Sequence, residues 1–131
     1  MAGGRTDVLR GVYDRWAEGD FRAAVDLFDP QIAFVVGPGF PDTGLYSGPE
    51  EIAGYMRHLL EPWDRLTIAA EEFIPAGDSI VVAVVQRGSG SESGAETEFR
   101  YFHVWSFRGD RVIRWENFRE REDALAAIGL D

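Results

Sequence analysis

The sequence contains neither cysteine nor lysine, because all 13 of its basic residues are arginines. Without cysteine there is no disulfide, no thiolate nucleophile and no thiolate metal site. Without lysine there is no Schiff base, no P-loop lysine and no Ser-Lys dyad. The only two histidines, His58 and His103, are far apart in the chain, so we expect neither a metal ion nor a cofactor.

Positive charge is also scarce: 13 basic residues against 23 acidic ones give a formal net charge of −10. Such a field repels a phosphate backbone and an anionic membrane surface. No apolar run approaches the roughly 20 residues of a membrane-spanning helix, and the first residues lack the apolar segment of a signal peptide. We therefore expect no nucleic-acid partner, no membrane partner and a cytoplasmic location.

Aromatic side chains are plentiful. The 131 residues are 45% hydrophobic and include four Trp, four Tyr and nine Phe. This length and content suit one globular domain with a substantial core. We expect a flexible tail over residues 1–7 and a single domain over residues 8–131.

Apolar residues follow a helical period in the first half of the chain and a period of two from residue 65 onward. The helical period and its end signals predict helices over 8–16, 21–28 and from 48 onward, and a short buried strand at 32–36. The period of two predicts strands near 65–75, 79–88, 95–108 and 111–120, before a short helical segment at 123–130. This order predicts an α+β fold, in which a cone-shaped, curved sheet wraps around the helices and leaves a cavity.

Three segments resemble landmarks of SnoaL-like sequences in the nuclear transport factor 2-like superfamily: VYDRWAEGDFRAAVDLFDPQIAF, PDTGLYSGPEEIAGYMRHLL and FHVWSFRGDRVIRWENF. The resemblance covers roughly residues 8 to 129. It implies a ketosteroid isomerase-like fold, a cystatin-like α+β barrel with a mixed or antiparallel sheet. The superfamily hosts isomerases, dehydratases, cyclases, epoxide hydrolases and non-enzymatic binders, so the resemblance does not imply one activity.

His103 is the first candidate for chemistry. Alternation along strand 95–108 places it between Tyr101 and Trp105 on an apolar face. Imidazole can accept and donate a proton near neutral pH. The resemblance implies an acidic or imidazole side chain at this position that contacts a substrate oxygen. The alternative is a buried histidine that is hydrogen-bonded to a neighbour and otherwise inert.

The best-known groups of the superfamily's enzymes are missing. Gly37 and Asn117 stand where steroid isomerases and SnoaL-type cyclases, respectively, carry an aspartate. Val12 matches the oxyanion-binding tyrosine of the isomerases, with Tyr13 one position off that face. An amide can orient a carbonyl but cannot take a proton as an aspartate does. We therefore expect Asn117 to orient an oxygen beside His103, and neither activity transfers directly.

Large side chains are expected to wall the cavity: Trp16, Phe28, Phe34, Tyr55, Met56, Trp105 and Trp115. Arg119 either pairs with an anionic substrate group at the cavity mouth or is simply exposed, and His58 is expected at the surface. The two C-terminal strands can both turn their aromatic faces inward only if a bulge or similar irregularity shifts their pairing.

The sequence therefore predicts a small-molecule pocket protein. It is either a cofactor-independent lyase, isomerase or cyclase for a hydrophobic carbonyl compound, or a non-catalytic ligand-binding or dimerisation domain of the same fold. A homodimer is expected, because the outer face of the sheet is too apolar for water. The residues expected on that face are Phe102, Val104, Val112 and Phe118.

Overall fold

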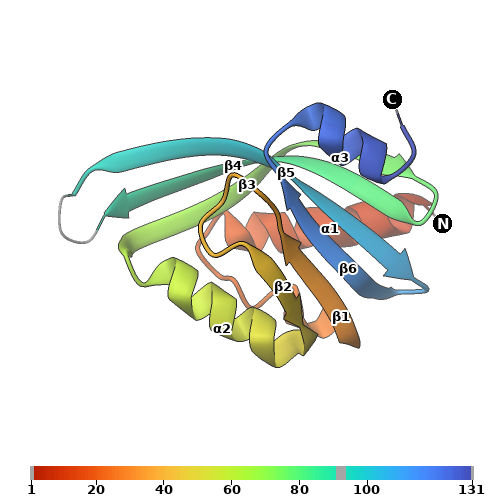
Figure 1. Cartoon of the computed structure of the whole chain (residues 1–131), viewed down its shortest axis with the longest axis horizontal. Coiled ribbons are helices and arrows are strands. Elements are labelled where there is room, and N and C mark those ends of the chain that lie inside the picture. Colours follow the sequence, from red (N-terminus) through yellow and green to blue (C-terminus); the bar gives the residue numbers. More distant parts are fainter. Residues whose placement is uncertain (1, 91–93, 131) are drawn as a thin grey trace.

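Six strands form one open sheet in the order β2-β1-β6-β5-β4-β3 (Figure 1). In this computed structural model, which describes residues 2–90 and 94–130, the strands are β1 Phe28–Val36, β2 Gly44–Ser47, β3 Trp63–Ala76, β4 Ser79–Gly90, β5 Glu96–Arg108 and β6 Arg111–Phe118. The pair β1–β6 is parallel and all other neighbours are antiparallel. The α+β fold with a mixed sheet is as predicted, but the sheet does not close into a barrel.

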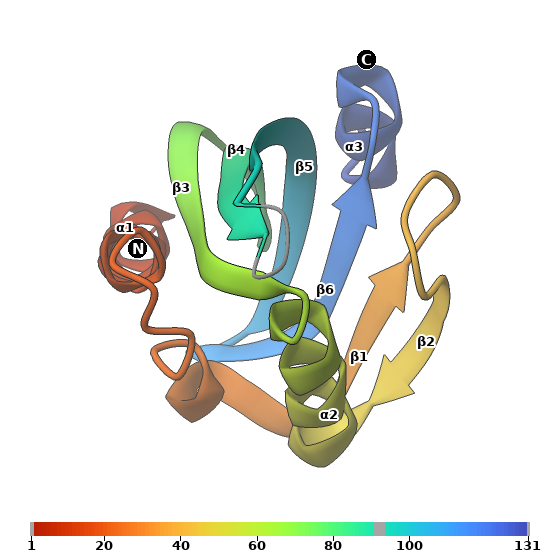
Figure 2. The ribbon, with the colours of Figure 1, turned by 90° about the vertical axis from the view of Figure 1, so that its left-hand side faces the viewer.

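The helices lie on both sides of the sheet (Figure 2). They are α1 Ala2–Trp16, α2 Gly48–Leu60 and α3 Arg121–Ala127. Helices α1 and α2 contribute to the main core on the concave side, and α3 packs against the convex side. Within the described part of the chain, no helix has the length and apolar character needed to cross a membrane.

The predicted start of the first helix at residue 8 is wrong, because α1 begins at Ala2, whereas the flexibility predicted for residues 1–7 stays a prediction. Arg5 holds this first part of the helix against the sheet. Its guanidinium donates to the Gly109 carbonyl at 2.8 and 3.1 Å and pairs with Asp78 at 2.7 Å. A local sequence pattern cannot predict these long-range contacts. They stabilise the helix in a segment that has only weak apolar periodicity.

The helix predicted over residues 21–28 is also wrong. Only a 3-10 turn at Val25–Leu27 forms, and Phe28 already starts β1. Phe28 is buried and pairs with Val112 of β6. Tertiary pairing and burial of this ring outweigh the local helical pattern.

A bulge in β6 sets which side chains face the core, as the sequence required. Trp105 lies opposite Trp115, but Phe107 lies opposite Val112, so the register shifts between Ser106 and Phe107. The extra residue lets both tryptophans point inward. It also turns Val112 inward, where the side chain is 0% exposed. The prediction that Val112 lies on the outer face is therefore wrong.

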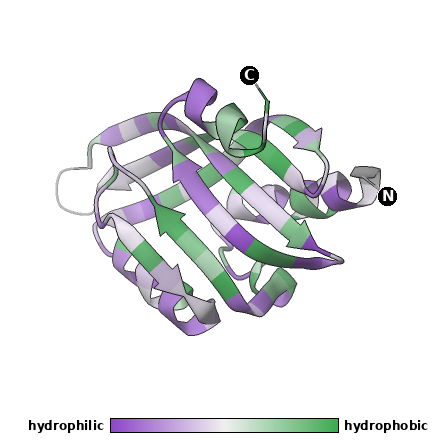
Figure 3. Ribbon diagram, turned by 45° about the vertical axis from the view of Figure 1, so that its right-hand side comes forward, coloured by the Kyte–Doolittle hydropathy of each residue, from purple (hydrophilic) through white to green (hydrophobic). Residues whose placement is uncertain are grey.

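Helix α3 covers the outer face near β4 and β5. Hydrophobic and hydrophilic residues alternate along the strands (Figure 3). The outward apolar ones meet α3 in a small cluster of Val81, Val104 and Ala124, with Phe102, Phe118, Leu125 and Ile128 packed around it. The apolar surface that led us to expect a homodimer is thus partly covered within the chain, although Phe102 and Phe118 stay half-buried, and dimerisation stays a prediction.

Candidate functional site

An open cleft of about 1040 Å³ lies between the end of α2, the loop after β1 and the inner face of β4, β5 and β6. Aromatic rings form much of its wall: Phe40, Tyr55, Trp63, Phe99 and Tyr101. Polar side chains interrupt that wall: Asp42, His58, Glu61, Gln86, Thr97, Asn117 and Arg119. This combination of apolar walls and a few polar groups is typical of small-molecule sites.

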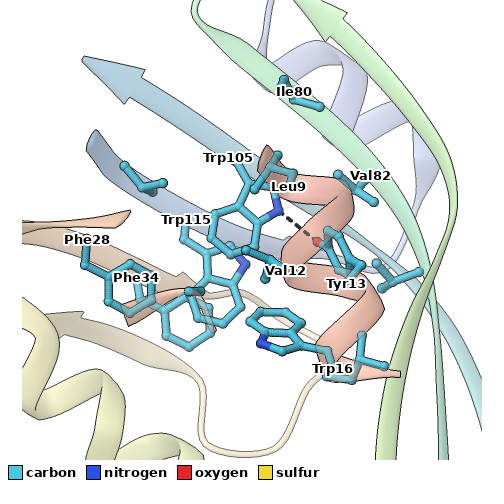
Figure 4. Packing of buried hydrophobic residues seen from close by; sticks show 14 of the residues in the cluster. Leu9, Val12, Tyr13, Trp16, Phe28, Phe34, Ile80, Val82, Trp105 and Trp115 are labelled. Carbon is cyan, nitrogen blue, oxygen red and sulfur yellow. Dashed lines mark hydrogen bonds between the residues drawn. The ribbon is translucent and has the colours of Figure 1, made fainter. Parts of the chain in front are cut away.

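The structure brings three of the predicted site residues, Tyr55, Asn117 and Arg119, to this cleft. The predicted wall residues that lie in the core instead are Trp16, Phe28, Phe34, Trp105 and Trp115 (Figure 4). Met56 is half-buried and packs against the same core. The buried rings fill one another's space: those of Trp105 and Trp115 stack with centroids 4.8 Å apart. These five large aromatic side chains therefore fill a packed core and do not wall the cleft.

His103 lies in this core and does not border the cleft. It is 1% exposed, and rings surround it, with the centroids of Tyr101 and Trp115 at 5.2 and 5.3 Å. Burial disfavours the imidazolium and lowers the pKa of His103 from 6.5 to about 3. The ring is therefore neutral at pH 7.

Tyr13 of α1 links His103 to Trp105. The Trp105 Nε1–H donates to the Tyr13 hydroxyl at 2.8 Å (Figure 4), and that hydroxyl lies 2.6 Å from His103 Nδ1. Because an indole can only donate, the tyrosine oxygen accepts from it, and we assign the hydroxyl proton to Nδ1. His103 then carries its own proton on Nε2. Burial also raises the pKa of Tyr13 well above its ordinary value, so the hydroxyl stays protonated.

Sequence reasoning missed Tyr13, which it placed off the relevant helix face. A signal was present: Leu9, Val12, Tyr13 and Trp16 have the i, i+3, i+4, i+7 spacing of a wide apolar stripe. All four are buried. A stripe of that width includes both neighbours Val12 and Tyr13, so choosing between them was unnecessary.

Asn117 is the polar group that joins the core to the cleft. It lies opposite His103 in the sheet, is 6% exposed and borders the cleft. Its Oδ1 has no hydrogen-bond partner among the described residues. The other unpaired buried side-chain atoms in the described part of the chain are Nε1 of Trp16 and Nε1 of Trp115, and neither residue borders the cleft. An unpaired buried carbonyl oxygen costs about 1–3 kcal/mol of stability, so Asn117 is held in this position by the packing around it.

Arg119 follows β6 and borders the same cleft. Its guanidinium carbon lies 4.4 Å from the centre of the Phe99 ring, and Nη1 donates to the Gly39 carbonyl at 3.0 Å. A Cβ on Gly39 would stand 2.7 Å from Arg119 Cγ, so glycine is needed for this close approach. No ion pair among the described residues includes Arg119.

His58 borders the cleft mouth, although sequence reasoning assigned it only to the surface. It is exposed, and its ring nitrogens lie 3.5 Å from an Asp42 oxygen and 3.7 Å from a Glu61 oxygen. The missed signal is its spacing of three residues from Tyr55, which puts both on one side of α2. Within residues 2–90 and 94–130, no group of three or more His, Asp or Glu side chains is placed to hold a metal ion.

The sequence profile of the SnoaL-like domain matches residues 9–115. The chain belongs to the SnoaL-like domain family. No curated protein matches the sequence significantly. The family assignment agrees with the observed fold. Because proteins of this fold have many different activities, the activity of this chain depends on the residues of its cleft.

Solved structures share the fold of this SnoaL-like chain. A nuclear transport factor 2-like protein from Burkholderia thailandensis is 25% identical, with a TM-score of 0.77 over 92% of this chain and 95% of that one. TerC, co-crystallised with polyporic acid, is 20% identical, with a TM-score of 0.75 over 95% and 96%. IdmH from Streptomyces antibioticus, a candidate polyketide cyclase, is 17% identical, with a TM-score of 0.72 over 96% and 99%.

Proposed function

We propose that this SnoaL-like chain is a small-molecule pocket protein that binds a hydrophobic, carbonyl-bearing compound in the cleft between α2 and the sheet. The observation that carries the proposal is the aromatic-walled cleft with the nearly buried amide of Asn117 at its edge, because an amide N–H group can donate to a ligand carbonyl. An amide presents a donor next to an acceptor, so it suits a ligand with oxygen functions. The likeness to TerC, co-crystallised with polyporic acid, supports a ligand of aromatic character.

A flat aromatic ketone, 2-acetylnaphthalene, should quench the fluorescence of Trp63. Trp63 is the tryptophan that borders the cleft, and its ring packs against bare backbone, since a Cβ on Gly88 would lie 2.6 Å from it. Tyr55→Ala should weaken the binding about tenfold, because the ring of Tyr55 loses its contact with the ligand.

Trp63→Phe is the control for this titration: it should remove most of the quenching while calorimetry still detects the ligand. Unchanged affinity in Tyr55→Ala would mean that the ligand binds elsewhere. No binding by calorimetry would contradict the proposal.

Catalysis without a cofactor, as in a lyase, isomerase or cyclase, is the second candidate. The likeness to IdmH favours it, and so does a histidine at the cleft mouth. His103 is a poor acid or base for this work, since it is enclosed and its pKa of about 3 is far from neutral. We propose that His103 and Tyr13 support the sheet behind Asn117, that Asn117 orients a substrate oxygen, and that His58 moves the proton.

Hydrogen–deuterium exchange tests this second candidate without the natural substrate. In heavy water, a cleft that enolises carbonyl compounds should speed deuterium entry into the methyl group of 2-acetylnaphthalene, as followed by proton NMR. His58→Gln should abolish the acceleration, and His103→Gln should keep it per folded molecule. No acceleration by the unsubstituted protein would favour the non-catalytic binding domain.

A further inference from the structure

We infer that Gln86 of β4 gives the cleft a preference for a carbonyl group, in addition to Asn117. Its side-chain amide N–H donates to the ligand oxygen, and Tyr101 is the positioning residue that holds the amide in this orientation. The inference rests on the proposed function, because it names a specificity-determining residue of the same cleft. It goes further, since it assigns the preference to a hydrogen-bonded pair that sequence reasoning did not single out.

The orientation of the Gln86 amide follows from its bond with Tyr101. The Tyr101 hydroxyl donates to Gln86 Oε1 at 2.9 Å. An amide has an acceptor at one end and two N–H donors at the other, so this bond leaves Nε2 as the free end. Gln86 is half-buried and borders the cleft, and its Nε2 is not among the enclosed, unpaired atoms of the described residues. The free end of the amide is therefore an accessible donor.

Tyr101 can hold this orientation because its own ring is fixed. The side chain is 4% exposed, and the ring centroids of Phe40, Phe99 and His103 lie 5.2, 5.3 and 5.2 Å from its own. Burial raises the pKa of Tyr101 far above its ordinary value, so the hydroxyl keeps its proton. If the amide turned over, this buried proton would lose its acceptor, which is unfavourable. The enclosed hydroxyl therefore selects the orientation in which Nε2 is free.

The Gln86 amide lies beside the aromatic wall against which we expect the flat ligand. Trp63 packs against the bare backbone of Gly88, which is two residues from Gln86 in β4. Residues two apart on a strand share a face, and their Cα atoms are about 7 Å apart. Phe99 lies opposite Gln86 in the pairing of β4 with β5 and also borders the cleft. A ring system that lies against Trp63 and Phe99 can therefore place a carbonyl group beside an uncharged donor.

Two naphthalene probes of nearly equal shape test the inference. 2-Acetylnaphthalene has a carbonyl oxygen, whereas 2-isopropenylnaphthalene has a CH2 group in its place and no acceptor. Calorimetry gives the ratio of their dissociation constants for each protein. In Gln86→Leu we expect this ratio to shift about fivefold against the ketone, the worth of one neutral hydrogen bond, while the alkene binds as before. Both probes are measured on the same preparation, so a smaller folded fraction cancels from the ratio.

Two further variants separate the donor from the space that it fills. At pH 8, Gln86→Glu keeps the side-chain length and an acceptor for Tyr101, but it turns an oxygen instead of an N–H group toward the ligand. The ratio should shift against the ketone by more than about fivefold, since two acceptors repel each other. Tyr101→Phe leaves the amide free to turn, so the ratio should shift by about twofold. In that background, Gln86→Leu should change the ratio less than it does in the unsubstituted protein.

The matched control is Gln31→Leu, which makes the same substitution at the other glutamine of the chain. Gln31 is exposed in β1 and does not border the cleft. The ratio of the two dissociation constants should therefore be unchanged.

Three outcomes would overturn the inference and leave the proposed function standing. One is a ratio that stays the same in Gln86→Leu and Gln86→Glu, whether both probes bind as before or lose affinity equally. The second is an equal shift in Gln31→Leu. The third is a ratio that shifts in Asn117→Leu but not in Gln86→Leu. Failure of both probes to bind the unsubstituted protein would contradict the proposed function itself, and the inference with it.

Discussion

Between pH 7 and pH 4 the protein should lose about 3 kcal/mol of its free energy of unfolding through His103 alone. Burial lowers the pKa of this ring from 6.5 to about 3 in the folded state. Below about pH 6.5 the unfolded chain therefore binds a proton that the folded chain does not. This stability is complete above that pH and is lost progressively as the pH falls toward 3.

Urea unfolding at a series of pH values measures the effect. The His103→Gln variant should lose about 3 kcal/mol less than the unsubstituted protein over this range, since the carboxylates titrate equally in both. An identical loss in His103→Gln would show that the ring is not buried as described.

The Tyr13→Phe variant should be less stable by about 3 kcal/mol at pH 7, although it keeps the ring. Loss of the hydroxyl leaves His103 Nδ1 and Trp105 Nε1 without their partner inside the core. Each unpaired buried group costs about 1–3 kcal/mol. Chemical denaturation of the two proteins gives the difference directly.

Tyr46→Phe is the matched control for Tyr13→Phe. It also removes one tyrosine hydroxyl, which donates to the Asp42 carbonyl at a site open to water. There water replaces the lost partner, so the cost should be about 1 kcal/mol or less. Equal losses in the two variants would contradict a buried hydrogen-bond chain through Tyr13.

The strands of the second half and helix α2 were predictable from the sequence. Alternation from residue 65 gave strands close to the observed ones, and the face that carries Tyr101, His103 and Trp105 is buried as expected. Local periodicity suffices there because each strand buries one face over many residues. Even the bulge in β6 could be inferred, since neighbouring strands must both turn their apolar faces inward.

Long-range contacts explain the parts that were missed. The start of α1 depends on Arg5 reaching Gly109 and Asp78, and β1 begins at Phe28 because that residue pairs with Val112. The sequence could not show that α3 covers part of the outer sheet face. A local pattern contains no information about partners that are dozens of residues away.

The cleft residues, too, were predictable from the sequence only in part. The sequence named Tyr55, Asn117 and Arg119 for the site, but it could not tell a wall from a core. Whether a ring borders a cavity depends on how far apart the elements pack, and that distance is set by all the side chains between them.

By itself the sequence determined the fold family, the inward faces of the strands, and the absence of cysteine and lysine chemistry. Only the tertiary structure decided that His103 is enclosed and neutral while His58 borders the cleft. The reason is physical: the alternation of residues sets the direction in which a side chain points. Its exposure to solvent or ligand, and hence its pKa, depends on everything packed in front of it.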